Sequence, residues 1–306
     1  MRSPSRLTHR RAVLLMVLVT LMWSIAGVVT RHLDAARGFE VNFWRSLCNA
    51  IGLFTALSVM RGPTFLRGLA TARWPVWASS LCWAAMFTAF MIALTLTTVA
   101  NVLVTLAVGP LITALFARLF LRHRLPLRTW AAIALGGAGI GWMFGQEAAA
   151  GASLTGSLVA FTVPFAAAIN WTLLQSIASG NAGDGEQPSD MLPAILVGAL
   201  LSAFITLPFA WPLQASFHDI ALLALLGVVQ LAIPCLLVVR LSRELPAAEI
   251  ALLGLLEILF GVTWAWLGAS EQPSPATLTG GSLVIAALIL NEVLAIRQKH
   301  AALAAS

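Results

Sequence analysis

Long apolar stretches alternate with short polar ones along the whole chain, and each apolar stretch is about long enough to cross a membrane. A transmembrane helix needs about 20 mostly apolar residues. The pattern predicts ten such helices, over residues 12–30, 39–59, 74–96, 99–121, 128–145, 155–178, 191–211, 219–240, 247–268 and 276–296. The weakest interruption lies between the third and fourth, from Thr95 to Asn101. We therefore expect an all-α integral membrane protein.

The composition agrees with this expectation. Of the 306 residues, 59% are hydrophobic and only 10% are charged, and the mean hydropathy is +0.91. About a quarter of the residues in an average soluble domain are charged. So few charged side chains cannot cover a water-soluble protein of this length, so the excess apolar surface must face lipid.

The basic residues are distributed unevenly between the two sides that these spans define. If the N-terminus is cytoplasmic, fifteen Lys and Arg side chains lie in cytoplasmic segments and two, Arg31 and Arg37, lie outside. This bias follows the positive-inside rule and predicts that both termini are cytoplasmic, in a bacterial-type inner membrane. One predicted cytoplasmic segment, the gap at 179–190, departs from this bias because it contains no basic residue. The net charge of +6 therefore indicates membrane orientation, and we expect no nucleic-acid partner.

A shift of 148 residues aligns the two halves of the chain. It pairs Trp23 with Trp171, and it also pairs Ala100 with Ala248, Leu111 with Leu259, Ala117 with Ala265 and Thr129 with Thr277. Each half, 1–148 and 149–306, then holds five spans. Because five is odd, the second half must cross the membrane with opposite polarity. Two inverted five-helix repeats are a common plan of secondary transporters, which bind substrate near the membrane midplane between the repeats.

Each half closes on a loose motif. In the second half, residues 246–257 read PAAEIALLGLLE, followed by an apolar run to Gly268-Ala-Ser-Glu271 and by Gly280. The first half has Gly109-Pro110, an apolar run and Arg122-His123-Arg124. These patterns resemble the EamA-type repeat of the drug/metabolite transporter superfamily. His123 stands where the family usually has Glu, and Gly109 stands at the repeat position of Glu257. The resemblance implies a ten-helix transporter of small metabolites such as amino acids.

Glu257 and Arg45 are the charged candidates for the substrate cavity. A carboxylate in the middle of a span costs roughly 2.5–3.5 kcal/mol on insertion scales, so Glu257 should face the interior of the bundle. It could couple transport to protons or bind substrate, or it could be a structural acid bonded to a neighbouring helix. Arg45 could bind a substrate carboxylate or pair with Glu257. The alternative for Arg45 is a side chain that snorkels to the outer interface.

Aromatic and polar side chains deep in the spans complete the predicted cavity. Trp23 and Trp171 are repeat mates that could stack on an apolar solute, and ordinary helix packing is the alternative. The other candidates are Trp83, Trp264, Asn101, Thr105 and Gln230. The polar members could orient substrate, or they could form hydrogen bonds between helices worth ~0.6 kcal/mol.

Three prolines within spans and one glycine-rich segment concern the backbone. Pro110, Pro164 and Pro234 each remove a backbone hydrogen bond, so each is a candidate hinge or a static bend. Residues 136–141 read GGAGIG inside an apolar span with no preceding strand. We expect close helix packing through Gly137 and Gly141 there.

These features favour a secondary transporter that moves a small amphipathic metabolite, such as an amino acid, by alternating access in the export direction. A proton-independent exchanger or uniporter of a nucleoside- or vitamin-like solute is the alternative, and an intramembrane enzyme or a structural subunit belongs to another class. All five histidines lie at span ends or outside, and the three cysteines have no metal spacing. We expect no enzymatic activity, no catalytic residues, no cofactor and no metal. The expected partners are the substrate, the lipid bilayer and at most a second copy of the chain, in a monomer or homodimer.

Overall fold

The computed structural model describes residues 8–62, 65, 72–120, 126–149, 154–178, 190–245 and 247–304. All the regular structure within these residues is helical, so the all-α prediction is confirmed for them. The first half contains α1 (His9–Ser24), α2 (Ala26–Thr30), α3 (Phe39–Arg61), α5 (Trp74–Leu96), α6 (Val99–Leu106), α7 (Gly109–Phe120) and α8 (Leu127–Ala149). The second half contains α9 (Thr155–Ala178), α10 (Leu192–Ala210), α11 (Phe217–Leu225), the π-helix η1 (Leu226–Ala232), α12 (Ile233–Leu241), α13 (Ala247–Gly254), α14 (Leu256–Ala269) and α15 (Pro275–Ala304).

Each predicted span coincides with one of these helices or with a run of consecutive ones. Within the part of the chain that the structure describes, seven segments are long and apolar enough to cross a membrane: His9–Thr30, Phe39–Arg61, Trp74–Leu96, Val99–Phe120, Thr155–Ile177, Leu192–Ala210 and Phe217–Leu241. Shorter apolar helices cover Leu256–Ala269 and Pro275–Asn291. The chain is therefore a multi-pass membrane protein. The crossing by the predicted fifth, ninth and tenth spans stays a prediction.

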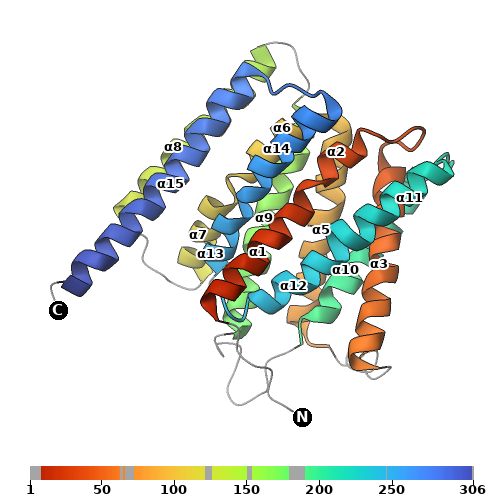
Figure 1. Ribbon diagram of the computed structural model, residues 1–306, viewed down its shortest axis with the longest axis horizontal. Coiled ribbons are helices and arrows are strands. Elements are labelled where there is room, and N and C mark those ends of the chain that lie inside the picture. The colour runs from red at the N-terminus through yellow and green to blue at the C-terminus, as the bar shows by residue number, and fades with distance from the viewer. Residues whose placement is uncertain are drawn as a thin grey trace.

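Helices α8 and α15 lie side by side along one flank of the bundle (Figure 1). Their backbones approach closely because glycine faces glycine: a methyl group on Gly139 would lie 2.7 Å from the carbonyl oxygen of Gly280. Such contacts replace the hydrophobic effect between helices, since lipid tails are as apolar as the side chains. The prediction that α8 packs closely through Gly137 and Gly141 is wrong, because a methyl group added at either position would meet no neighbouring helix within 4 Å. The rotation of α8 about its axis points Gly139 at the partner helix instead.

The remaining helices form the main bundle. In it, α5 packs between α9 and α10, α3 packs on α10 and η1, and α1 lies against α12 and α14. Proline begins two of these helices, since Pro75 and Pro193 occupy first-turn positions where no backbone N–H is needed. The start of α11 is held by a capping box, in which Ser216 and Asp219 bond each other's backbone N–H groups.

Several predicted spans are not continuous α-helices. The fourth span breaks between Leu106 and Gly109, where Pro110 has no N–H to bond the carbonyl of Leu106. The ninth breaks at Leu255. The eighth contains the π-helix η1 just before Pro234, which likewise cannot donate to the carbonyl of Gln230. Backbone therefore opens or widens at these three places near the middle of the bundle, and the first span is also interrupted, at Ile25 between α1 and α2.

Candidate functional site

A cavity lies in the middle of the bundle, where the broken spans meet. Its wall is built from both halves of the chain: the first half contributes residues of α1, α3, α5, α6 and α7, and the second half contributes residues of α9, η1, α12, α13 and α14. Six of the nine predicted cavity residues line it: Trp23, Arg45, Trp83, Trp171, Gln230 and Glu257. Two of the three predicted hinge prolines, Pro110 and Pro164, line it as well.

The two helix breaks supply backbone to this cavity. Leu106, Gly109 and Pro110 line it at the end of α6 and the start of α7. Gly254 and Leu255 do the same between α13 and α14. Backbone that is freed from helical hydrogen bonding inside a membrane is tolerated where it lines a cavity. The third predicted hinge, Pro234, is buried next to the lining residue Cys235.

Arg45 is held deep in the wall by hydrogen bonds. Its side chain is only 1% exposed. Its Nε and Nη2 groups donate to Oε1 of Gln230 at 3.3 and 3.1 Å, and Nη1 donates to the carbonyl of Phe87 at 3.4 Å. The guanidinium carbon also lies 5.7 Å from the ring centroid of Phe90, which is within the range of a cation–π contact. The alternative, in which Arg45 snorkels to the outer interface, is therefore wrong.

The partner of Arg45 is placed by the π-helix. Gln230 lies on η1, and its Nε2 group donates to the carbonyl of Trp23 at 3.2 Å. Three residues earlier, Gly227 allows η1 to touch α3, because a methyl group there would lie 2.6 Å from the carbonyl oxygen of Arg45. Gln230 thus joins α3 of the first half to η1 of the second and to the end of α1.

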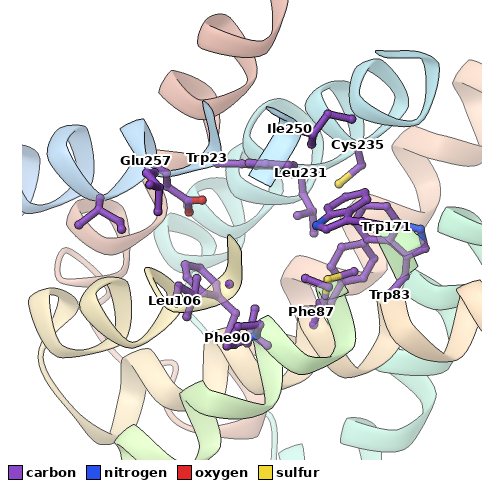
Figure 2. A pocket seen from close by; sticks show the side chains of 18 of the residues that line it. Trp23, Trp83, Phe87, Phe90, Leu106, Trp171, Leu231, Cys235, Ile250 and Glu257 are labelled. Atoms are coloured by element: carbon purple, nitrogen blue, oxygen red, sulfur yellow. The ribbon is translucent and has the colours of Figure 1, made fainter. Parts of the chain in front are cut away.

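Glu257 enters the cavity from the first turn of α14, and its carboxylate points into the cavity (Figure 2). Among the described residues, no hydrogen bond or ion pair to this carboxylate occurs. Arg45 and Glu257 attract each other across the same cavity without forming an ion pair. The cavity thus presents a cation and an acid to whatever it holds.

Aromatic rings form much of the remaining wall (Figure 2). Trp83 packs edge-on against Trp171 with ring centroids 5.6 Å apart, and it lies 5.4 Å from Phe87. Such faces and edges suit an apolar or aromatic group. Phe87 and Phe90 also line the cavity but were not predicted to do so. A phenylalanine in an apolar span does not indicate which face of the helix it lies on.

Three predicted cavity residues lie elsewhere. Thr105 donates to the carbonyl of Asn101 at 2.7 Å, and Asn101 accepts a hydrogen bond from Thr277 on α15. Trp264 donates from Nε1 to the hydroxyl of Ser24 at 3.1 Å. Asn101 and Trp264 therefore bond neighbouring helices, whereas Thr105 bonds within its own helix α6.

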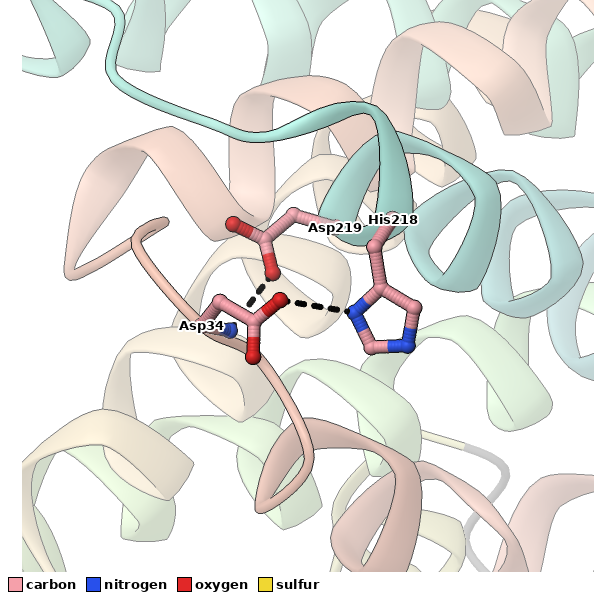
Figure 3. Close-up of side chains that lie close together, drawn as sticks. All are labelled: Asp34, His218 and Asp219. Carbon is pink, nitrogen blue, oxygen red and sulfur yellow. Dashed lines mark hydrogen bonds and ion pairs between the residues drawn. The ribbon is translucent and has the colours of Figure 1, made fainter.

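A second cluster of ionisable groups joins the loop after α2 to the start of α11. One ligand atom each of Asp34, His218 and Asp219 lies within 4.8 Å of the others, and His218 Nδ1 lies 3.1 Å from Asp34 (Figure 3). The Asp219 carboxylate, however, accepts backbone N–H groups of Asp34, Ala35, Ala36 and Ser216 at 2.7–3.1 Å. It therefore anchors a loop, and its oxygens are already occupied.

The comparisons with known proteins agree with this architecture. Residues 10–145 match the model of the EamA-like transporter family. The match agrees with the resemblance that the sequence motifs indicate, and it covers somewhat less than half of the chain, all of it within the first half. No functionally curated protein matches the sequence significantly.

Twenty-five chains of solved structures are similar to the fold. One of them is a crystal structure that matches with a TM-score of 0.62 at 19% sequence identity. The match covers 95% of this chain and 99% of the other. At this identity the likeness concerns the fold alone. It shows that the arrangement of helices extends over both halves, including the part beyond residue 145.

Proposed function

We propose that this protein is a secondary transporter that exports a small amphipathic metabolite, such as an amino acid, by alternating access. The observation that carries the proposal is the mid-bundle cavity in which Arg45 and Glu257 face a shared space with aromatic walls. A planar guanidinium suits a carboxylate, a carboxylate suits an ammonium group, and the rings suit an apolar side chain. The family match supports transport as the activity.

The correspondence of the helix breaks supports two inverted repeats, 1–148 and 149–306. The 148-residue shift carries α6 (Val99–Leu106) onto α13 (Ala247–Gly254), and it carries the start of α8 onto the start of α15. It also carries Gly109, at the start of α7, onto Glu257. Paired interrupted spans at corresponding positions mark the substrate site in transporters of this design.

The packing partners are also related by the same shift. Helix α5 packs on α9, and their counterparts η1 with α12 pack on α1; α6 packs on α14, and α7 packs on α13. Helices that correspond to each other, α3 with α10 and α8 with α15, pack together. This is the pattern of a pseudo-twofold axis between the halves. Rocking of one repeat against the other would expose the cavity to each side in turn.

Transport assays in proteoliposomes test the proposal. The purified protein should move at least one labelled member of a panel of zwitterionic amino acids, and Arg45→Gln should lose most of that transport. Transport of nucleoside- or vitamin-like solutes by exchange, with no response to an imposed pH gradient, would favour the alternative. A panel without any transported solute, in any gradient, would leave a structural or enzymatic role and contradict the proposal.

The orientation is tested separately. The positive-inside bias predicts that both termini are cytoplasmic. Reporter fusions after residue 306, and within the loop between α2 and α3, should report opposite sides of the inner membrane. A reporter at the C-terminus that is active outside the cytoplasm would contradict the orientation.

A further inference from the structure

Contacts that lie outside the cavity join the two halves of the chain at one end of the bundle. This end carries the loop between α2 and α3, and it lies opposite the start of α1 (Figure 1); we call it the far end. Residues of α2, of the turn between α5 and α6, and of the end of α14 meet there. The first two belong to the first half of the chain and the third belongs to the second half, so the contacts join the two halves.

Arg31, directly after α2, uses three groups of its guanidinium in these contacts. Nη1 donates to the carbonyl of Leu94 at 2.8 Å, and Nη2 donates to the carbonyl of Thr97 at 2.9 Å. Both carbonyls lie at the C-terminal end of α5, where the helix dipole favours a cation. The third group, Nε, donates to Oε2 of Glu271 at 2.9 Å.

Glu271 follows α14 and completes the contact. Its Oε1 atom accepts the backbone N–H of Val99 at 2.6 Å, in the first turn of α6. A carboxylate at this position satisfies a backbone donor that the helix leaves free and interacts favourably with the dipole of α6. Its side chain is only 15% exposed, so solvent screens the ion pair less than it would at an open surface.

Next to this ion pair, one face of α14 packs closely on the first half at two glycines. Gly261, Trp264 and Gly268 lie on that face, since they are three and four residues apart. A methyl group on Gly268 would lie 2.6 Å from Cγ2 of Val28, and one on Gly261 would lie 2.5 Å from Cδ1 of Leu103. Trp264 adds its hydrogen bond to Ser24. The cavity residues of α14, Glu257 and Ile258, lie immediately below this face.

We infer that Arg31 and Glu271 form a latch that closes the far end of the transport pathway. The closed seam consists of α14 against α2 and α6, and the latch ties it at its rim. Opening toward the far side must separate Glu271 from Arg31 and from Val99, because α14 cannot move away from α6 otherwise. The inference rests on the proposed transport by alternating access, and it assigns a role to charged residues that do not line the cavity.

Thiol labelling of Cys235 tests the latch without a substrate. Cys235 lines the cavity, and replacement of Cys48 and Cys82 by alanine leaves it as the single thiol. A membrane-impermeant maleimide is applied from either side of oriented vesicles. The parent should be labelled slowly from the far side. Glu271→Gln and Arg31→Gln should each raise the far-side rate about tenfold, since charge-assisted hydrogen bonds are about twice as strong as neutral ones.

Glu249→Gln is the matched control. It removes the 2.9 Å ion pair between Glu249 and His9, which lies at the opposite end of the bundle, and it should leave far-side labelling unchanged. Unchanged labelling from the near side shows that each variant is folded. Far-side rates that stay at the parent value in both latch variants would overturn the inference.

A cross-link gives a second test that does not depend on weakening the protein. In a background without native cysteines, Arg31→Cys with Glu271→Cys is bridged by a short reducible bifunctional reagent. Transport should stop while the bridge is present and return after reduction. Transport at an unchanged rate through the bridged protein would overturn the latch, whereas transport absent even after reduction and in the unmodified parent would instead contradict the proposed function.

Discussion

At the scale of single residues, the burial of Arg45 is the most costly feature of the cavity. A buried charge is stable only with good hydrogen-bond partners, and Gln230 supplies one oxygen to two of its N–H groups. Gln230 in turn bonds the backbone of Trp23. The guanidinium is therefore fixed in orientation before any substrate arrives, which reduces the entropy lost on binding.

Arg45→Lys tests this orientation. A lysine ammonium keeps the charge but lacks the planar fork that matches both Gln230 and a carboxylate. We expect transport of an amino acid to fall about tenfold or more while the protein stays folded, as measured by uptake into proteoliposomes. Arg240→Lys, on the exposed side of α12, is the control and should transport normally. Equal rates for both variants would remove Arg45 from the site.

Glu257→Gln tests proton coupling. The carboxylate has no bonded partner among the described residues, so protonation there would break no hydrogen bond or ion pair between them. We expect the variant to lose the stimulation of transport by a pH gradient but to keep exchange of internal for external substrate. A wild-type rate that does not depend on the gradient would refute coupling and leave uniport or exchange.

At the scale of elements, backbone interruptions and glycine contacts determine the architecture. Residues at or beside the breaks at 107–108 and 255 line the cavity. The contact between Gly139 and Gly280 allows α8 and α15 to pack closely. Pro110 made an irregularity predictable in the fourth span, because proline lacks a donor. The break in the ninth span has no proline, so no comparable signal marked it.

Substitutions within one helix separate glycine packing from helix propensity. Gly139→Ala would place a methyl group 2.7 Å from the carbonyl oxygen of Gly280, whereas Gly137→Ala faces open space. We expect Gly139→Ala to cost roughly 1–3 kcal/mol through overpacking and Gly137→Ala to be neutral or slightly stabilising. Thermal unfolding in detergent measures both. Equal midpoints would mean that α8 and α15 are not packed at this position.

At the scale of the whole molecule, hydropathy predicted where the helices lie, since length and apolarity are local properties. It did not predict which way each helix turns its faces. Trp83 and Trp264 are both deep tryptophans, yet only Trp83 lines the cavity. Asn101 has the polarity of a site residue but bonds to α15. Rotation about a helix axis depends on contacts with neighbours far away in the chain, and one sequence does not reveal these.

The most direct test of the central claim is transport by the purified protein in proteoliposomes, compared with Arg45→Gln. We expect saturable transport of an amino acid or a similar zwitterion by the parent. The transport rate of the variant should be lower by at least about tenfold, with both proteins equally folded. No movement of any solute by the parent across a broad panel and all imposed gradients would contradict it.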